Sequence, residues 1–422
     1  MAETLKTPRG TRDLLPSETR LWLKVEEAFR RTFRAYGYEE IRTPLFEATE
    51  LFVRGIGEGT DIVNKEMYTF SDRKGRSLTL RPEGTAGVVR AYVEHSLGAG
   101  ESGEAKLYYI GPMFRYERPQ AGRYRQFWQA GVEAIGFADP LSDAEVVAML
   151  VQALAEAGLQ GLSVDINSVG CPDCRPAYLE LLKAHLRAHA AELSAESQER
   201  LLTNPMRVLD SKDPKDAGVV DSAPKTTNHL CTACSAHFAA VLRLLERAGV
   251  EHQVNKKLVR GLDYYSRTAF EVLSGDLGAQ NAVAGGGRYD KLVGELSGND
   301  RPAVGFGVGL DRLIQLLSQR PQDAEAACDV ALIALGNPAY AAAFGLAQEL
   351  RGLGLCAWMD LSRKRGMKNQ MKTAAALKAR YALILGDDEL AKGVAAVKDM
   401  NSGEQASLPL QGLAKAMMGK IR

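Results

Sequence analysis

The sequence predicts an α+β protein built from several structural units. Two segments rich in aromatic and β-branched residues, 106–117 and 124–137, flank a turn with proline and glycine, which predicts a long antiparallel hairpin. Residues 171–251 are instead dominated by Ala, Leu, Glu and Arg, which predicts a mostly helical insertion. Beyond residue 328, strand and helix patterns alternate, which predicts a small α/β unit.

The first predicted elements are a helix and an extended segment. Ser17 can cap the helix, apolar residues then recur at helical spacing, and Gly37 ends the run. The extended segment, 38–46, contains Pro44, which cannot donate a hydrogen bond to a neighbouring strand. We therefore expect this segment to be an edge or interface strand.

The later elements follow from capping and strand patterns. Ser142 and Glu145 have the spacing of a capping box, which predicts a helix that ends at Gly158. Strands are predicted at 162–166, 268–273, 282–284, 304–308, 330–335, 356–359, 381–385 and 394–397. These elements define the first part of a larger domain at 1–170, the insertion at 171–251, the second part of that domain at 252–320 and the C-terminal unit at 328–422.

Composition indicates an ordinary globular protein. Of the 422 residues, 45% are apolar and 25% are charged, and no apolar run is long enough to span a membrane. Together with an N-terminus that lacks a secretory pattern, this predicts a cytoplasmic protein without a membrane partner. Residues 328–422 hold 13 Lys and Arg against 8 Asp and Glu, which fits contact with a polyanion. A solvated helical face is the alternative, and charge alone favours it.

The predicted hairpin carries a cluster of arginines. Four of them, Arg115, Arg118, Arg123 and Arg125, fall within eleven residues. Guanidinium groups match phosphate oxygens in pairs, so the cluster suits a bound polyphosphate. Alternation along a strand would place Arg115 and Glu117 on one face.

A second signal lies at 304–313, where glycines alternate along a strand and Arg312 begins the following helix. The alternation leaves one strand face without side chains, so a flat ring could lie against it. Arg312 could then cover the ring or pair with a phosphate. The spacing matches neither the dinucleotide-binding nor the P-loop pattern.

Four of the six cysteines form two CxxC pairs, Cys171 with Cys174 and Cys231 with Cys234. The local spacing is that of zinc ligands, but 56 residues separate the pairs. Reduced, uncoordinated thiols are the alternative, so the sequence commits to no metal. Two nearby histidines could also serve as ligands, namely His229 and His237.

These motifs resemble those of class II aminoacyl-tRNA synthetases. The Arg115 hairpin and residues 309–312 resemble motifs 2 and 3, and residues 37–47 resemble motif 1, which forms the dimer interface in that family. The resemblance implies a six- to seven-stranded antiparallel catalytic sheet with flanking helices, a C-terminal α/β anticodon-binding domain and a homodimer.

Three further stretches narrow the resemblance. Residues 258–265 and 285–290 resemble the two histidine-specific signatures of histidyl-tRNA synthetases, and residues 79–85 also match. The resemblance covers nearly the whole chain in order. It implies that the protein activates L-histidine with ATP and Mg²⁺, releases pyrophosphate, and transfers histidine to the 3′ end of its tRNA.

The resemblance implies roles at the ATP site. Arg115 would hold the α-phosphate, Arg312 the far phosphates or the adenine face, and Glu117 the adenine amino group. Arg260 would contact the α-phosphate from the side opposite Arg115, although an ion pair with Asp263 is the alternative. The implied ATP set is Arg115, Glu117, Arg123, Tyr124, Phe127, Gly309 and Arg312.

Histidine and tRNA residues follow from the same resemblance. Glu83, Thr85 and Gln129 would bind the α-amino group, with Glu133 and Tyr265 on the imidazole. The implied histidine set is Glu83, Thr85, Arg115, Gln129, Glu133, Arg260, Tyr264, Tyr265 and Tyr289. Candidate tRNA contacts are Arg118, Gln120 and Arg125 at the acceptor stem, and Arg363, Lys364 and Lys368 at the anticodon stem.

Two alternatives of other classes remain. A histidine-sensing regulatory subunit of ATP phosphoribosyltransferase shares this catalytic fold, but it predicts loss of the ATP arginines and of the C-terminal domain. A synthetase-like RNA-binding protein without activity also predicts loss of those arginines. Arg115, Arg260 and Arg312 are all present here.

Overall fold

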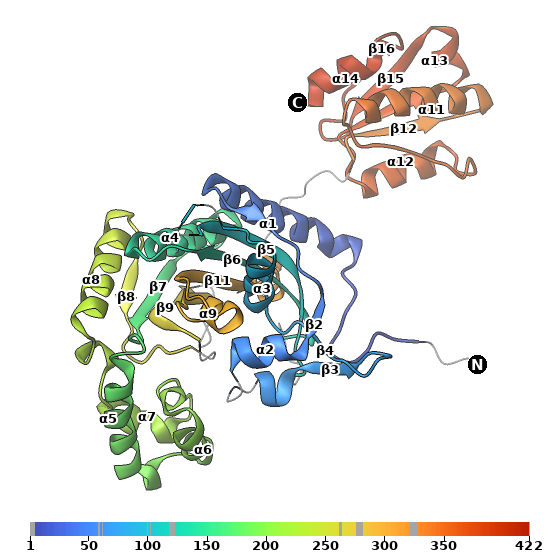
Figure 1. The fold of residues 1–422 in the computed structure, drawn as a ribbon. Helices are drawn as coiled ribbons and strands as arrows, with labels where there is room; N and C mark the ends of the chain where they lie inside the picture. Colours follow the sequence, from blue (N-terminus) through green and yellow to red (C-terminus); the bar gives the residue numbers. More distant parts are fainter. Residues whose placement is uncertain are drawn as a thin grey trace. The chain divides into compact units, whose positions relative to one another are not determined.

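The structure is a computed structural model that forms two compact units, the larger of which ends at Arg320. It describes residues 5–57, 60, 62–98, 100–101, 103–117, 123–260, 264–275, 282–320 and 328–421. Figure 1 draws the chain and labels its helices and strands.

The larger unit is built on an eight-stranded sheet of order β1-β5-β6-β11-β10-β9-β7-β8. The strands span Glu39–Glu40 (β1), Ala105–Phe114 (β5), Gln126–Ile135 (β6), Leu162–Ser168 (β7), His252–Val254 (β8), Ser266–Ser274 (β9), Ala282–Arg288 (β10) and Ala303–Gly309 (β11). The six inner strands are antiparallel, whereas the short edge strands β1 and β8 run parallel to their neighbours. The resemblance implied six to seven strands, and the two short edge strands raise the number to eight.

One face of this sheet is covered by four helices, α1 (Pro16–Ala35), α4 (Pro140–Glu156), α8 (Thr232–Arg247) and α10 (Leu310–Ser318). Their apolar sides form one core with the strands, in which Phe33 packs 5.9 Å from Phe306 and 5.2 Å from Tyr108. Because side chains alternate along β6, Val132 joins this core while Gln129 and Glu133 point to the opposite face.

The opposite face carries α3 (Thr85–Glu94) and α9 (Leu292–Ser297), which pack on Tyr109, Met113 and Tyr289. A separate small sheet of order β2-β4-β3 adjoins α2 (Thr49–Ile56). Its strands span Phe46–Ala48 (β2), Tyr68–Ser71 (β3) and Ser77–Leu80 (β4), and a π-helical turn, η1, covers Ile62–Glu66.

Two details of the sequence prediction are wrong. The helix predicted from a capping box at Ser142 begins at Pro140, because the Asp139 carboxylate accepts the Leu141 N–H at 2.8 Å. Ser142 Oγ instead donates to the Asp139 carbonyl at 2.8 Å. The extended segment 38–46 is not one strand, since β1 ends at Glu40, and its proline lies between β1 and β2.

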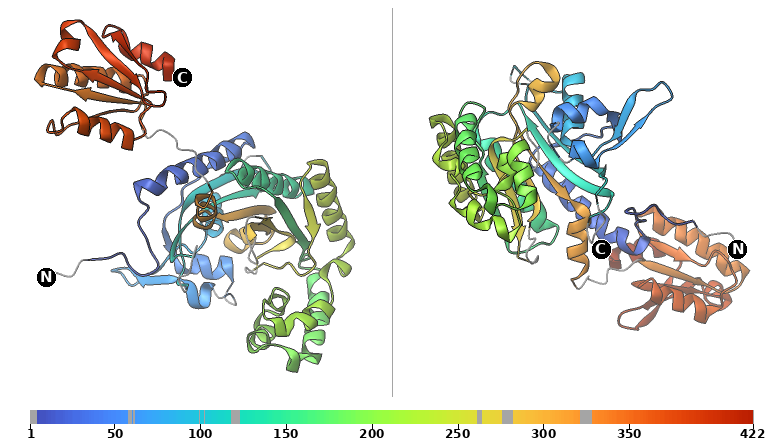
Figure 2. Two further views of the ribbon diagram at one scale, coloured as in Figure 1. Left: turned by 180° about the vertical axis from the view of Figure 1, so that it is seen from behind. Right: turned by 90° about the horizontal axis from the view of Figure 1, so that it is seen from below.

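The predicted helical insertion is confirmed as helical. It holds α5 (Arg175–Ala188), α6 (Ala195–Thr203) and α7 (Ala217–Ser222), with 3₁₀ turns η2 (Ala190–Glu192), η3 (Pro205–Val208), η4 (Pro214–Asp216) and η5 (Thr226–Asn228). Tyr178, Leu182 and Val220 belong to a core of its own. These helices form a lobe in Figures 1 and 2, while the last helix of the segment, α8, packs into the sheet core instead.

The C-terminal unit is a five-stranded sheet of order β13-β12-β14-β15-β16 between helices. Its strands span Val330–Ala334 (β12), Ala357–Met359 (β13), Tyr381–Leu385 (β14), Val394–Asp399 (β15) and Gln405–Pro409 (β16), and its helices span Asn337–Gly352 (α11), Met367–Ala376 (α12), Asp387–Ala391 (α13) and Leu413–Ile421 (α14). β12 runs parallel to β13 and β14, whereas β15 is antiparallel to both of its neighbours, β14 and β16. The largely exposed β16 was not predicted. No described helix is both long and apolar enough to cross a membrane.

Candidate functional site

A cavity of about 430 Å³ opens in the larger unit. Five of its lining residues are arginines, which come from the connection between β5 and β6, the segment before β9, α10 and the helical lobe. The lining is Ile62, Glu66, Arg115, Glu117, Arg123, Tyr124, Phe127, Arg207, Arg260, Tyr265, Gly309, Asp311 and Arg312. Such a concentration of positive charge suits a polyanionic ligand.

The structure brings the whole predicted ATP set to this cavity. Arg115 follows β5, and its Nε donates to the Pro82 carbonyl at 2.8 Å. Glu117 lies between two guanidinium groups, 3.9 Å from Arg115 and 3.7 Å from Arg123. The strand argument for Arg115 and Glu117 is wrong, however, because β5 ends at Phe114 and both residues lie beyond it.

Arg260 reaches the cavity from the segment before β9. Its guanidinium forms a 2.6 Å ion pair with Glu271 and lies 5.7 Å from the centre of the Tyr265 ring. A Cβ atom on Gly285 would overlap that guanidinium, and one on Gly287 would overlap the Tyr265 ring. The glycines of the 285–290 signature therefore make room for side chains of the 258–265 signature. The alternative partner, Asp263, lies outside the described residues.

The alternating glycines of β11 also make room for neighbouring side chains. A Cβ atom on Gly305 would overlap the Glu133 carboxylate, and one on Gly307 would overlap the Gln129 amide. Only Gly309 lines the cavity, with nothing within 4 Å of its missing Cβ. The glycine surface that was predicted to receive a flat ring is therefore limited to Gly309. Gly305 and Gly307 instead leave space for side chains of β6.

Beside the cavity lies a buried polar cluster that contains most of the predicted histidine set. Glu133 accepts hydrogen bonds from Thr85 Oγ1 at 2.7 Å and from the Tyr289 hydroxyl. Glu83 accepts the N–H groups of Thr85 and Ala86 at 2.7 and 2.8 Å, at the start of α3. The Tyr264 ring stands 4.7 Å from Tyr265 and 5.6 Å from Tyr289.

Burial sets the protonation of this cluster. It raises the pKa of Glu133 to about 8, with the Glu83 carboxyl adding to the rise, and it also raises the pKa of Glu83. Gln129 presents a buried Oε1 without a hydrogen-bond partner among the described residues. Of the histidine set, only Arg115, Arg260 and Tyr265 line the cavity itself. Tyr265 joins the cavity to the cluster.

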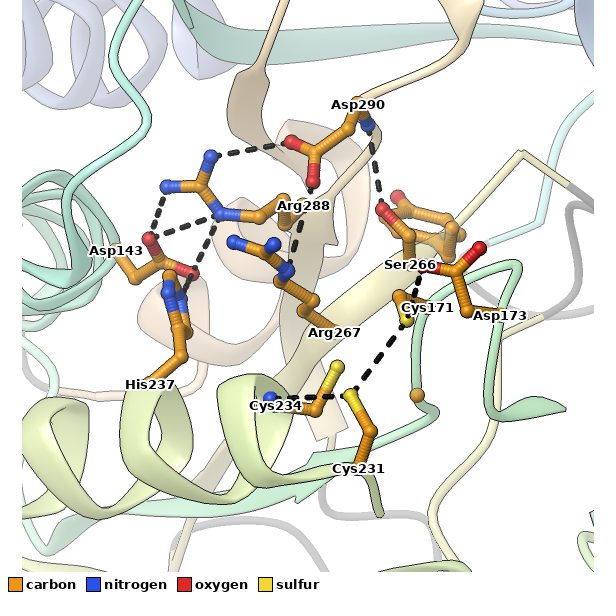
Figure 3. A network of polar contacts seen from close by, with 12 residues as sticks. Asp143, Cys171, Asp173, Cys231, Cys234, His237, Ser266, Arg267, Arg288 and Asp290 are labelled. Atoms are coloured by element: carbon orange, nitrogen blue, oxygen red, sulfur yellow. Dashed lines mark hydrogen bonds and ion pairs between the residues drawn. The ribbon is translucent and has the colours of Figure 1, made fainter.

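A second buried network lies around the end of β10 (Figure 3). Arg288 is fully buried on β10 and donates to the Asp143 carboxylate of α4, to the Phe137 carbonyl at 2.9 Å and to Asp290 at 3.1 Å. His237 of α8 contacts the same Asp143 carboxylate at 3.3 Å. Burial alone would raise the pKa of Asp143, but His237 and Arg288 lower it to about 2. The network joins β10 to two helices of the core.

Sequence reasoning missed several residues of the site. Arg207 lines the cavity from η3 of the helical lobe, and no local motif marks it because only the fold brings it there. Arg12 holds Asp311 at 3.6 Å and lies over the Tyr124 ring at 5.0 Å. Asp311 also accepts the Trp128 N–H at 2.7 Å, which fixes the start of α10.

The predicted tRNA residues fall into three groups. Arg118 and Gln120 lie outside the described residues. Arg125 stacks over the Tyr116 ring at 4.0 Å and is not part of the cavity lining. The third group, Arg363, Lys364 and Lys368, is exposed in the C-terminal unit between β13 and α12, with Lys368 at the start of α12.

The mixed sheet, the arginine-lined cavity and the separate C-terminal α/β unit are those of a class II aminoacyl-tRNA synthetase. The family model described as histidyl-tRNA synthetase matches residues 10–313, and that of the anticodon binding domain matches residues 329–419. The chain belongs to the histidyl-tRNA synthetase family.

Individual relatives agree with this assignment. The histidine–tRNA ligase of Desulfitobacterium hafniense is 50% identical over 420 residues, covering 99% of each chain, and that of Halothermothrix orenii is 48% identical. The structure of apo histidyl-tRNA synthetase from S. aureus superposes with a TM-score of 0.82 at 37% identity, covering 98% of this chain and 100% of that one. A Bacillus halodurans structure titled as an ATP phosphoribosyltransferase regulatory subunit/histidyl-tRNA synthetase, at 23% identity and a TM-score of 0.66, shares the fold.

Proposed function

We propose that the chain is a histidine–tRNA ligase whose arginine-lined cavity is where L-histidine and ATP react. The histidine carboxylate attacks the α-phosphorus of ATP, pyrophosphate leaves, and histidyl-adenylate forms. The adenylate then passes histidine to the 3′ end of the tRNA. The observation that carries the proposal is the convergence of Arg115 and Arg260 on one cavity from two connecting segments that are far apart in the sequence.

The arginines act on the phosphates. Negative charge builds on the α-phosphate oxygens as the carboxylate approaches, and fixed guanidinium groups stabilise it without reorganising. Arg115 is held by the Pro82 carbonyl and Arg260 by Glu271, so both are positioned before ATP binds. Arg312 and Arg123 take the far phosphates, and the Phe127 and Tyr124 rings take the base.

Mg²⁺ accompanies ATP in this proposal. An ATP-bound Mg²⁺ takes one or two carboxylates together with phosphate oxygens and water. The Glu66 carboxylate lines the cavity and would supply such a ligand, while Glu117 would meet the adenine amino group. When bound, the ion would supply charge that neutralises the phosphates, while the arginines orient the α-phosphate.

The buried cluster recognises histidine. The Gln129 Oε1 atom lacks a partner among the described residues and is placed to accept a hydrogen bond from the α-ammonium group. Glu133 and Tyr265 pair with the two imidazole nitrogens, which need an acceptor and a group that can donate. An amino acid without those nitrogens would leave buried polar groups unpaired, and such sites discriminate by as much as ~10⁴- to 10⁵-fold.

The remaining partners follow from the family. The C-terminal unit binds the anticodon arm of the tRNA, with Arg363, Lys364 and Lys368 near its phosphates. The enzyme forms a homodimer through the segment around β1, which is the sheet edge, and β2, where Leu45 and Phe46 are about half exposed. The site of action is the cytoplasm, where proteins are synthesised.

Amino-acid-dependent exchange of pyrophosphate into ATP tests the proposal. We expect the wild-type protein to catalyse exchange with histidine and with none of the other nineteen standard amino acids. Exchange that depends on a different amino acid would overturn the histidine assignment. Histidine binding without any exchange would overturn the ligase and favour a regulatory protein that only senses histidine.

A further inference from the structure

The two CxxC pairs, distant in sequence, meet in the fold. Cys171 and Cys174 lie between β7 and α5, while Cys231 caps α8 and Cys234 lies in its first turn. All four Sγ atoms lie within 4.8 Å of one another. Figure 3 shows Cys171, Cys231 and Cys234 side by side next to the Arg288 network.

The sulfur positions match a single tetrahedral metal ion. Zinc–thiolate bonds are about 2.3 Å long, which places the sulfurs of a tetrahedral site about 3.8 Å apart. The Sγ–Sγ distances are 3.7 Å for Cys171–Cys174, 3.9 Å for Cys171–Cys231 and 3.9 Å for Cys174–Cys234. Disulfides require about 2.05 Å, and all four cysteines are free.

The backbone is arranged to stabilise thiolates. The Cys171 N–H points to Cys174 Sγ at 3.3 Å, and the Cys234 N–H points to Cys231 Sγ at 3.5 Å. The positive end of the α8 dipole lies at Cys231 and favours negative charge there. Gly170 has a φ of 72°, which turns the chain into the first pair.

We propose that Cys171, Cys174, Cys231 and Cys234 bind one structural Zn²⁺ ion. Each thiol releases its proton as it becomes a ligand, and no electron is transferred. Four protein ligands leave no open position, so the ion has no catalytic role. A tetrahedral set of four thiolates also accepts iron, whereas oxygen-preferring ions are disfavoured.

The histidines named as alternative ligands are engaged elsewhere. The His237 ring contacts Asp143 in the buried network at 3.3 Å. The His229 ring packs near Tyr178, with 6.0 Å between the ring centres. The cysteines therefore form the complete ligand set.

The ion would hold the helical lobe against the histidine site. It closes the loop of residues 175–230, which contains α5, α6 and α7. Arg175, the residue after Cys174, donates to the Val169 carbonyl at 3.1 Å and also to the Tyr265 carbonyl. The lobe also carries Arg207 into the cavity. Loss of the ion would therefore loosen both Arg207 and the backbone of Tyr265. The resulting loss of activity rests on the proposed function.

Metal content of the purified full-length protein tests the proposal directly. We expect about one zinc per chain by elemental analysis in protein prepared without chelators, as for structural sites of four cysteines. The double variant Cys174→Ser/Cys234→Ser should lose it, while Cys356→Ser, which changes an exposed cysteine of the C-terminal unit, should retain it. Equal zinc in the double variant and the wild type would overturn the site, as would wild-type protein without metal. About one iron per chain in place of zinc would overturn the choice of ion.

Cobalt substitution keeps the proposal testable if the variants do not fold. Wild-type protein, stripped of metal under reducing conditions and titrated with Co²⁺, should develop thiolate-to-cobalt absorption and the visible bands of tetrahedral cobalt, saturating at about one ion per chain. Zn²⁺ should then abolish these bands. Absence of the bands would overturn the proposal even if histidine-dependent exchange is normal, so its failure is distinct from failure of the proposed function.

A stability measurement separates a structural ion from an adventitious one. We expect a chelator to lower the unfolding temperature of the wild-type protein and to increase protease cleavage between residues 175 and 230. Cys356→Ser should respond as the wild type does. An unfolding temperature and cleavage pattern that the chelator leaves unchanged, with zinc removed, would contradict a structural role.

Discussion

Arg260 and Arg288 lie in the two histidine signatures but in opposite environments. Arg288 donates from Nε and both terminal nitrogens to partners inside the protein. Arg260 lines the cavity, pairs with Glu271, and has a buried Nε without a hydrogen-bond partner among the described residues. An arginine whose donors are used internally holds the fold, whereas one with donors left over at a cavity is available to a ligand.

The largest loss of activity is expected for variants of Arg260, the arginine that lines the cavity. Arg260→Ala should lower histidine-dependent ATP–pyrophosphate exchange by about 10³-fold, or ~4 kcal/mol, because it removes charge stabilisation at the α-phosphate. Its unfolding temperature should stay near that of the wild type. The matched control, Glu271→Gln, removes the ion-pair partner but keeps the arginine, and should retain most activity. Equal losses in both variants would mean that Arg260 acts only through its ion pair.

Substitution of Arg288, whose donors are used inside the protein, should instead lower the stability of the fold. Arg288→Ala leaves the Asp143 carboxylate buried without its arginine partner, and breaking a buried ion pair typically costs about 3–5 kcal/mol of unfolding free energy. Urea unfolding measures this loss. Arg267→Ala is the control on the neighbouring strand, where a partly exposed guanidinium stands 3.9 Å from Asp290, and it should cost under ~1 kcal/mol. A stable Arg288→Ala protein would remove the contrast between the two arginines.

Between these extremes lies Glu133, which is both buried and placed for histidine. Glu133→Gln should raise the KM for histidine by about 10- to 100-fold, since a buried polar group left without its partner costs about 1–3 kcal/mol. The KM for ATP should change little. Steady-state exchange at varied histidine and ATP separates the two constants, and a change confined to ATP would contradict the assignment.

The difference in unfolding free energy between the wild type and Glu133→Gln should also depend on pH. The pKa of Glu133 is about 8 in the folded chain against an ordinary 4.5, so the folded state keeps the proton longer than the unfolded state. The stability that this proton contributes is complete below pH 4.5 and is lost as the pH rises through 8. The unfolding free energy of the wild type should therefore fall relative to Glu133→Gln over this range. A pH-independent difference between the two proteins would show that Glu133 is ionised throughout.

The smallest effect is expected at Arg207. This guanidinium is about a quarter exposed and already has Asp210 at 3.7 Å. Arg207→Ala should raise the KM for ATP by about threefold to tenfold, or ~1 kcal/mol. Arg200→Ala, on α6 of the same lobe but absent from the cavity lining, serves as the control and should leave the KM unchanged.

The sequence predicted the hairpin, the helical insertion and four of the five cavity arginines because each lies in a local pattern or motif. Arg115, Glu117 and Tyr124 are close in sequence, so their meeting needs only a turn. Arg207 could not be predicted in the same way, because its place at the cavity depends on how the lobe packs. The use of Gly285 and Gly305 also required the fold, since a glycine pattern does not reveal which neighbouring side chain fills the space.

Binding of a non-hydrolysable histidyl-adenylate analogue tests the central claim, that histidine and ATP meet between Arg115 and Arg260. Calorimetric titration should give one site per chain in the wild type. Arg115→Ala and Arg260→Ala should each weaken binding by at least about tenfold, or ~1.4 kcal/mol. Arg125→Ala, whose guanidinium stacks on Tyr116 away from the cavity lining, should bind as the wild type does. Unchanged affinity in both cavity variants would contradict the account.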